Sequence, residues 1–129
     1  MSSCPFCDPA VWQRESIGIE NELCLFLTRP AAVLPGSGMI ITRQHRATVF
    51  DLTADEWQAT YQLLLDVKAH LDAVYQPDGY NVGWNSGISG GQEVFHVHLH
   101  VIPRFADEPL AGKGIRYWLK QDNNRRPGR

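Results

Sequence analysis

Three histidines in strict alternation are the residues of this chain best suited to chemistry. They are His96, His98 and His100, in a run that is otherwise mostly apolar. Because side chains of a strand alternate between its faces, the three imidazoles would share one face, with neighbours about 6.6 Å apart. The apolar residues between them would point to the other face and into a core. One shared pocket would penalise their simultaneous protonation, which argues against a purely structural role. A neutral imidazole fixed in this way can act as a nucleophile towards phosphorus.

A glycine-rich loop precedes the histidines and adds hydrogen-bond donors. Residues 86–92 include Gly91 and Gln92, and Asn85 stands just before them. Backbone N–H groups of such a loop, together with side-chain amides, suit the oxygens of a phosphate. We therefore expect the loop and the histidines to form one site, in which the central residue His98 is the nucleophile.

Short elements on either side of one long helix must position this site. Four runs have strand patterns, and their ranges are 23–28, 39–42, 79–85 and 93–102. Thr53 and Glu56 form a capping-box pattern, which predicts the start of an amphipathic helix that ends before Pro77. No βαβ rhythm repeats along the chain, so we predict an α+β fold with an antiparallel sheet and one long helix.

Three further features complete the expected architecture. The helix has a predicted apolar stripe made of Trp57, Tyr61, Leu64, Val67 or Lys68, Leu71 and Tyr75. Residues 114–120 form a short amphipathic segment that is either helical or extended. Cys24 lies inside an apolar strand pattern, so we expect it to be a small core residue.

Size and composition fit a single domain with an ordinary interior. The chain has 129 residues, of which 43% are hydrophobic, and this is enough to build a core. The net charge of −2 offers no general attraction for nucleic acid, and no apolar run is long enough for a membrane span. We expect neither partner. The cysteine usage and the absence of a secretory pattern at the N-terminus favour a cytoplasmic protein.

Residues 91–104, GQEVFHVHLHVIPR, resemble the signature of the histidine-triad (HIT) family of nucleotide hydrolases and transferases. The strand–Pro-Gly–strand–Arg-x-His segment from Leu23 to His45, the long helix and the Asn85 loop also follow in the family's order. The resemblance implies a HIT-like fold whose two-fold dimer shares one continuous sheet, and hence a homodimer.

The resemblance covers about residues 4–104 of a single domain spanning 1–129. Residues 105–129 would then shape substrate choice or dimer contacts, with Tyr117 and Trp118 as candidates.

The resemblance also implies the reaction. His98 would attack the α-phosphorus of a nucleoside phosphoramidate or a dinucleoside polyphosphate, and water would resolve the nucleotidyl-histidine intermediate to a nucleoside monophosphate. His100 matches the residue that supports the nucleophile, and His96 matches the first of the three catalytic histidines. The positions matched to substrate binding are Asn85, Gly91, Gln92 and Glu93.

Three residues depart from the family pattern. They do not affect the reaction type that the resemblance implies, but they leave the preferred substrate open. Arg29 stands where many relatives have Asp or Asn to hold the ribose hydroxyls, and Ser37 replaces a common histidine. Glu93 stands where several relatives have Ser or Thr. A carboxyl group there could relay a proton to the leaving group but would repel a polyphosphate.

A second site is indicated by Cys4 and Cys7, which have knuckle spacing but need two more ligands to close a zinc site. The best candidates are His45 and His96, as in the Cys-Cys-His-His set of similar bacterial relatives and of galactose-1-phosphate uridylyltransferases. We expect structural zinc, outside the reaction, and no organic cofactor. The alternative is two ordinary reduced thiols beside an exposed His45.

Two other functions stay open. A metal-dependent hydrolase could use all three histidines as ligands of one ion. However, the first and last histidines of an extended strand would lie about 13 Å apart, which is too far for metal–ligand bonds of about 2 Å. A nucleotide-binding protein with vestigial chemistry would keep the same residues, because an intact motif does not set a turnover rate.

Overall fold

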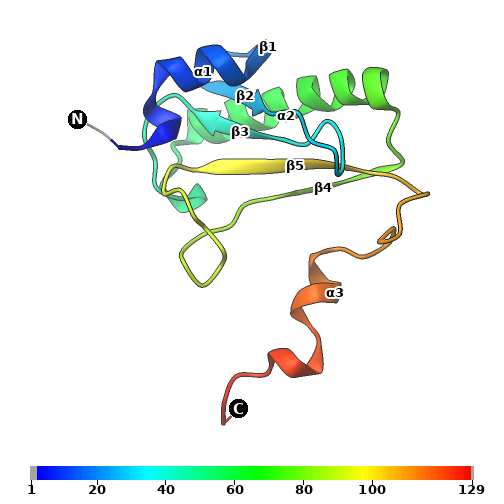
Figure 1. The fold of residues 1–129 in the computed structure, drawn as a ribbon. Coiled ribbons are helices and arrows are strands. Elements are labelled where there is room, and N and C mark those ends of the chain that lie inside the picture. The colour runs from blue at the N-terminus through cyan, green and yellow to red at the C-terminus, as the bar shows by residue number, and fades with distance from the viewer. Residues whose placement is uncertain (1–2, 129) are drawn as a thin grey trace.

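Five strands form one antiparallel sheet, and a long helix covers one face of it (Figure 1). The computed structural model describes residues 3–128. In the sheet order β1-β2-β3-β5-β4, the strands are β1 (Ser16–Glu20), β2 (Cys24–Thr28), β3 (Gly38–Thr42), β5 (His98–Arg104) and β4 (Gly79–Gly83). The helices are α1 (Pro9–Glu15), α2 (Ala54–Tyr75) and α3 (Ile115–Leu119), with short 3-10 turns at Pro5–Cys7, Val49–Asp51 and Asp122–Asn124. The predicted α+β class is confirmed.

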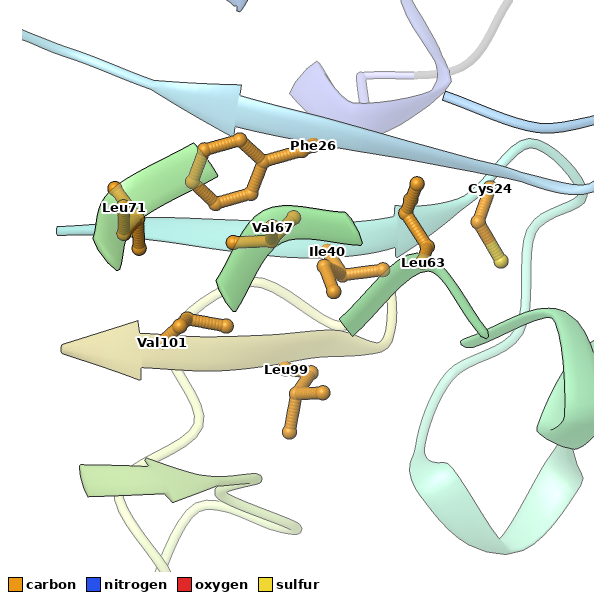
Figure 2. Packing of buried hydrophobic residues seen from close by; sticks show 8 residues of the cluster. All are labelled: Cys24, Phe26, Ile40, Leu63, Val67, Leu71, Leu99 and Val101. Atoms are coloured by element: carbon orange, nitrogen blue, oxygen red, sulfur yellow. The ribbon is translucent and has the colours of Figure 1, made fainter. Parts of the chain in front are cut away.

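The face of the sheet under α2 carries the main hydrophobic core (Figure 2). Its members come from four elements and are Cys24, Phe26, Ile40, Leu63, Val67, Leu71, Leu99 and Val101. Removing such side chains from water stabilises the fold by about 25 cal/mol per Å² of apolar surface. Cys24 lies in this core as predicted, and burial raises the pKa of its thiol, which keeps it protonated and unreactive.

The opposite face of the sheet carries two of the three histidines. β5 pairs with β3 so that His98 lies opposite Ile41 and His100 opposite Met39. A second apolar cluster lies on this face. In it, Phe6 and Val11 of the N-terminal segment join the strand residues Leu25, Leu27 and Ile41. The alternation of β5 therefore divides the sheet between a structural face and a face that carries chemistry.

α1 and β1 are not among the predicted elements, although local signals for α1 exist. The Asp8 side chain accepts from the Ala10 N–H (2.9 Å), and Pro9 takes the first helical position. Both are ordinary features of a helix start. The indole N–H of Trp12 donates to the Phe6 carbonyl (2.9 Å), which holds this short helix against the preceding turn.

α2 begins at the predicted capping box but buries a different stripe. The predicted stripe is wrong at Trp57, Tyr61 and Tyr75, which are 54%, 59% and 39% exposed. The buried positions of the helix are instead Glu56, Thr60, Leu63, Val67 and Leu71. The helix is turned in this way because Glu56 faces inward, where its carboxylate accepts from Arg46 Nε (2.9 Å).

The predicted strand over residues 93–102 is wrong at its start, because β5 begins only at His98. His96 lies in the irregular segment before the strand, so the three histidines do not share one strand face. The Val97 N–H donates to the Arg46 carbonyl (2.7 Å), which ties this segment to the chain before α2.

The C-terminal segment leaves the sheet after β5 and extends away from it (Figure 1). The predicted amphipathic segment 114–120 is helical over Ile115–Leu119. Within residues 3–128, none of the helices has the length and apolar character needed to cross a membrane.

Glu56 supplies a test of how α2 is fixed. Burial alone would raise the pKa of its carboxyl, but hydrogen bonds from the Thr53 backbone and Arg46 outweigh burial and lower the pKa. A lowered pKa stabilises the fold above the unfolded value of about 4.3, and this contribution is lost as the pH falls through the folded value. We expect Glu56→Gln to lower the free energy of unfolding by about 1–3 kcal/mol at pH 7 and by much less near pH 3.

Urea denaturation at the two pH values measures this difference. Asp55→Asn is the matched control, because Asp55 is an exposed carboxylate in the same helical turn. Equal losses for the two variants at pH 7 would contradict the role given to the buried pair.

Candidate active site

The backbone holds the imidazole of His98 in one tautomer. Its Nδ1–H donates to the carbonyl of His96 (2.8 Å), since a carbonyl can only accept. In the neutral ring this bond leaves the lone pair on Nε2, which is the form that an attacking imidazole needs. Phe6 packs edge-on against the ring with centroids 5.3 Å apart, so the orientation is fixed as well.

His100 stands next to His98, with ring centroids 4.9 Å apart at 74°. Burial and then the neighbouring charge of a protonated His98 lower the pKa of His100. The His100 ring is therefore neutral at pH 7 and offers both a hydrogen-bond donor and an acceptor. As positive charge develops on His98, a neutral neighbour adds no repulsion.

Two cavities meet at His100. The larger, of about 390 Å³, lies between β4, β5 and the C-terminal segment, where Asn85 and Trp118 line it. The smaller, of about 320 Å³, lies between α1 and the β2–β3 connection, where Glu15 and Arg29 line it. Both volumes are in the range of small-molecule sites, so each side of His100 can receive part of a ligand.

The glycine-rich loop is closed by hydrogen bonds of its own. The N–H groups of Gly91 and Gln92 donate to carbonyls of the same turn, at 2.9 and 3.0 Å. The Gln92 side chain is buried, and its Oε1 accepts from the Gly87 N–H (2.9 Å). Its Nε2 donates to the carbonyls of Ala47 (2.6 Å) and Val94 (3.1 Å), so this amide fastens the loop to the chain before α2.

Of the residues predicted to bind substrate, some line a cavity and others do not. Asn85 lines the larger cavity together with His100. Glu93 is exposed, whereas both N–H bonds of the Gln92 amide are directed at backbone carbonyls. Contact of Gly91, Gln92 and Glu93 with a phosphate stays a prediction.

The four residues predicted to bind metal lie together: Cys4, Cys7, His45 and His96. Their ligand atoms are all within 4.8 Å of one another. Cys7 Sγ is 3.2 Å from His45 Nδ1 and 3.5 Å from His96 Nδ1, and Cys4 Sγ is 3.5 Å from the same His96 atom. Tetrahedral zinc with bonds of about 2.0–2.3 Å sets its ligands about 3.3–3.8 Å apart. The donor types and their spacing therefore form a possible metal site that suits zinc.

His96 is oriented for this role by its second ring nitrogen. Its Nε2–H donates to the Thr42 carbonyl (2.7 Å), which leaves the lone pair of Nδ1 directed at the two thiols. Burial lowers the pKa of His96, although the hydrogen bond to Thr42 opposes this, so the ring is neutral, as a metal ligand must be.

Arg104, at the end of β5, has a role that sequence reasoning missed. Its guanidinium donates to the carbonyls of Leu110 (2.7 Å) and Lys113 (2.9 Å), and to the Asn81 side chain on β4. These bonds hold the segment that carries Trp118 over the larger cavity. Arg104 Nε also donates to the Glu108 carboxylate (2.7 Å), and this i,i+4 pair is the one signal that the sequence offers for the role, because the carbonyl partners leave no trace in it.

Glu15 is the second residue that sequence reasoning missed, and it lies beside two of the departures from the family pattern. Its buried carboxylate is 3.0 Å from Arg29 Nε. Ser37 closes the neighbouring turn, because its hydroxyl donates to the Leu34 carbonyl (2.7 Å). Glu15 reaches this place only through α1, which the sequence patterns do not predict.

Comparison with known proteins settles the family. The sequence profile of the HIT domain matches residues 13–107, which is most of the chain. The chain belongs to the HIT family. This HIT protein is 32% identical over 125 residues to a HIT-like protein of Mycoplasma genitalium, covering 96% of this chain and 86% of the relative.

Two further relatives of the HIT protein bear on its sites. A bis(5′-adenosyl)-triphosphatase of Dictyostelium discoideum is 28% identical over 96 residues, covering 74% of this chain and 64% of the relative. The crystal structure of a Zn-bound histidine-triad family protein from Mycobacterium smegmatis matches with a TM-score of 0.69 and 25% identity, covering 87% of this chain and 82% of the other.

The Gln92 amide gives a test of how the loop of this HIT protein is held. We expect Gln92→Ala to destabilise the fold by about 1–3 kcal/mol, because buried backbone groups at Gly87, Ala47 and Val94 lose their partner. Amide hydrogen exchange over residues 86–92 should also become faster. Glu93→Gln, which changes the exposed neighbour, is the control. Unchanged exchange in Gln92→Ala would contradict this role.

Proposed function

We propose that this HIT protein cleaves nucleotide conjugates at the α-phosphate, with His98 as the nucleophile. The substrate class is a nucleoside phosphoramidate or a dinucleoside polyphosphate. The observation that carries the proposal is the 2.8 Å hydrogen bond from His98 Nδ1 to the His96 carbonyl, because it leaves Nε2 ready to attack.

In the first step, His98 Nε2 bonds to the α-phosphorus and the bond from that phosphorus to the leaving group breaks. The His96 carbonyl stabilises the imidazolium that forms. The leaving group takes up a proton, for which the Glu93 carboxyl is our candidate relay. In the second step, water attacks the phosphorus, the bond to Nε2 breaks, and a nucleoside monophosphate leaves. Asn85 and His100 would contact the phosphate from the larger cavity.

The substrate class is supported by the named relative. The matched protein of Dictyostelium discoideum is a bis(5′-adenosyl)-triphosphatase, and its match spans most of both chains. In such a substrate, the phosphorus that is attacked lies between a nucleoside on one side and a nucleoside diphosphate leaving group on the other. Two cavities that meet at His100 could receive these two parts.

The alternative of a metal-dependent hydrolase built on the three histidines is not favoured by the geometry. Both ring nitrogens of His96 already face other groups, namely the cysteine thiols and the Thr42 carbonyl. Across residues 3–128, the metal-ligand group found leaves out His98 and His100.

Loss of the nucleophile tests the proposed reaction. We expect His98→Ala to lower the rate of adenosine monophosphate release from adenosine 5′-phosphoramidate by at least about 10³-fold. Intact mass spectrometry after rapid, acid-free quenching should find a nucleotidyl adduct on the wild type and none on the variant. His70→Gln, on α2 and outside the site, is the control. Tight monophosphate binding by a wild type that forms neither adduct nor product would instead indicate a nucleotide-binding protein.

We also propose that Cys4, Cys7, His45 and His96 hold a structural zinc ion that ties the N-terminal turn to the segment before β5. The relative from Mycobacterium smegmatis, which is described as Zn-bound, supports this. We expect about one zinc per chain by plasma mass spectrometry, and a lower melting temperature after chelation. Cys7→Ser should lose the metal, whereas the core variant Cys24→Ala should keep it. Zinc-free protein whose stability is unchanged by Cys7→Ser would contradict the site.

We further propose that two copies pair through β4, an edge strand of the sheet, to form a continuous sheet. Val82 on this strand is 47% exposed, and beside the sheet the exposed Trp57 stacks on Trp84 with ring centroids 5.6 Å apart. Light scattering should therefore give twice the mass of one chain. Val82→Lys should shift the equilibrium towards the monomer, and Val33→Lys, in an exposed loop, should not. A monomeric wild type at micromolar concentration would contradict the pairing.

A further inference from the structure

Glu15 is a buried carboxylate with one oxygen satisfied and one not. The residue is 6% exposed at the end of α1. Its Oε2 lies 3.0 Å from Arg29 Nε. Its Oε1 is buried and makes no hydrogen bond with any group of residues 3–128. Leaving a buried acceptor unsatisfied is costly, so such an atom points to a donor that arrives with a ligand.

The space next to Glu15 restricts what that ligand can be. The carboxylate lines the smaller cavity, whose other walls are mainly aliphatic and include Leu27, Leu34, Met39 and Ile102. His100, the neighbour of the proposed nucleophile, also lines this cavity. A fitting ligand therefore has an apolar body, a neutral or charged donor near Glu15, and a reacting group near His100.

The charge balance favours a neutral donor. Arg29 already lies against one carboxylate oxygen and compensates its charge, so a second cation at Oε1 would face the guanidinium across a short distance. A hydroxyl group carries no such penalty and gains a charge-assisted hydrogen bond. A nucleotide carries ribose hydroxyls, an apolar base and a phosphate, and the cavity offers an acceptor, an aliphatic wall and His100 to receive them.

We propose that Glu15 Oε1 accepts a hydrogen bond from a ribose hydroxyl of the bound nucleotide and so selects ribonucleotides over deoxyribonucleotides. Arg29 holds the carboxylate in position from the other side. The inference rests on the proposed function and deepens it, because it assigns the nucleoside of the cleaved nucleotide to the smaller cavity and leaves the larger one for the leaving group.

Equilibrium binding tests this assignment without requiring turnover. Isothermal titration calorimetry compares adenosine monophosphate with its 2′-deoxy and 3′-deoxy analogues. We expect the wild type to bind at least one deoxy analogue about 10- to 100-fold more weakly, as for a lost hydrogen bond to a charged group. In Glu15→Ala the ratio should fall to within about threefold, and in Glu15→Gln, which keeps a neutral acceptor, it should be intermediate. Glu22→Ala, which removes an exposed carboxylate that does not line the cavity, should keep the wild-type ratio.

The outcomes separate this inference from the proposed reaction. A wild type that binds all three nucleotides equally, or none of them, overturns the inference, and this result does not depend on any variant folding. A ratio that Glu15→Ala leaves unchanged overturns it while the hydrolysis proposal stands. A ratio that depends on Glu15, in a protein that releases no monophosphate from its conjugates, supports the inference and overturns the hydrolysis.

Discussion

The hydrogen bond from His98 Nδ1 to the His96 carbonyl is the contact on which the rest of this site depends. His96 precedes β5, so its carbonyl lies outside the hydrogen-bond ladder of the sheet and can accept from a side chain. The imidazole ring of His96 is fixed between the Thr42 carbonyl and the thiols of Cys4 and Cys7. One residue therefore couples the geometry of the cysteine–histidine cluster to the tautomer of the proposed nucleophile.

The sheet keeps the demands of stability and chemistry apart. Leu99 and Val101 of β5 lie in the core beneath α2, whereas His98 and His100 between them lie on the other face. A close-packed interior gives these histidines little freedom to move along the strand. Polar groups that would be costly in the core can then gather on the second face, where the N-terminal segment covers them only in part.

Local patterns are sufficient for some of this structure and not for the rest. The capping box that starts α2 follows from residue types and spacing alone, and the four metal-site residues follow from the spacing of Cys4 and Cys7 together with the family resemblance. The buried stripe of α2 does not, because the inward position of Glu56 depends on its partner Arg46. The same holds for the start of β5, which depends on a bond from Val97 to the Arg46 carbonyl. Glu15 gains a role only through its place in three dimensions.

The attachment of the C-terminal segment has a consequence for how this protein can change over evolution. Arg104 binds that segment through the Glu108 side chain and, further along, through the main-chain carbonyls of Leu110 and Lys113, which every amino acid supplies. Mutations between these points and in α3 can therefore accumulate without releasing the segment from the sheet. The lining of the larger cavity can therefore change while the histidines stay as they are, which would let the proposed reaction accept new leaving groups.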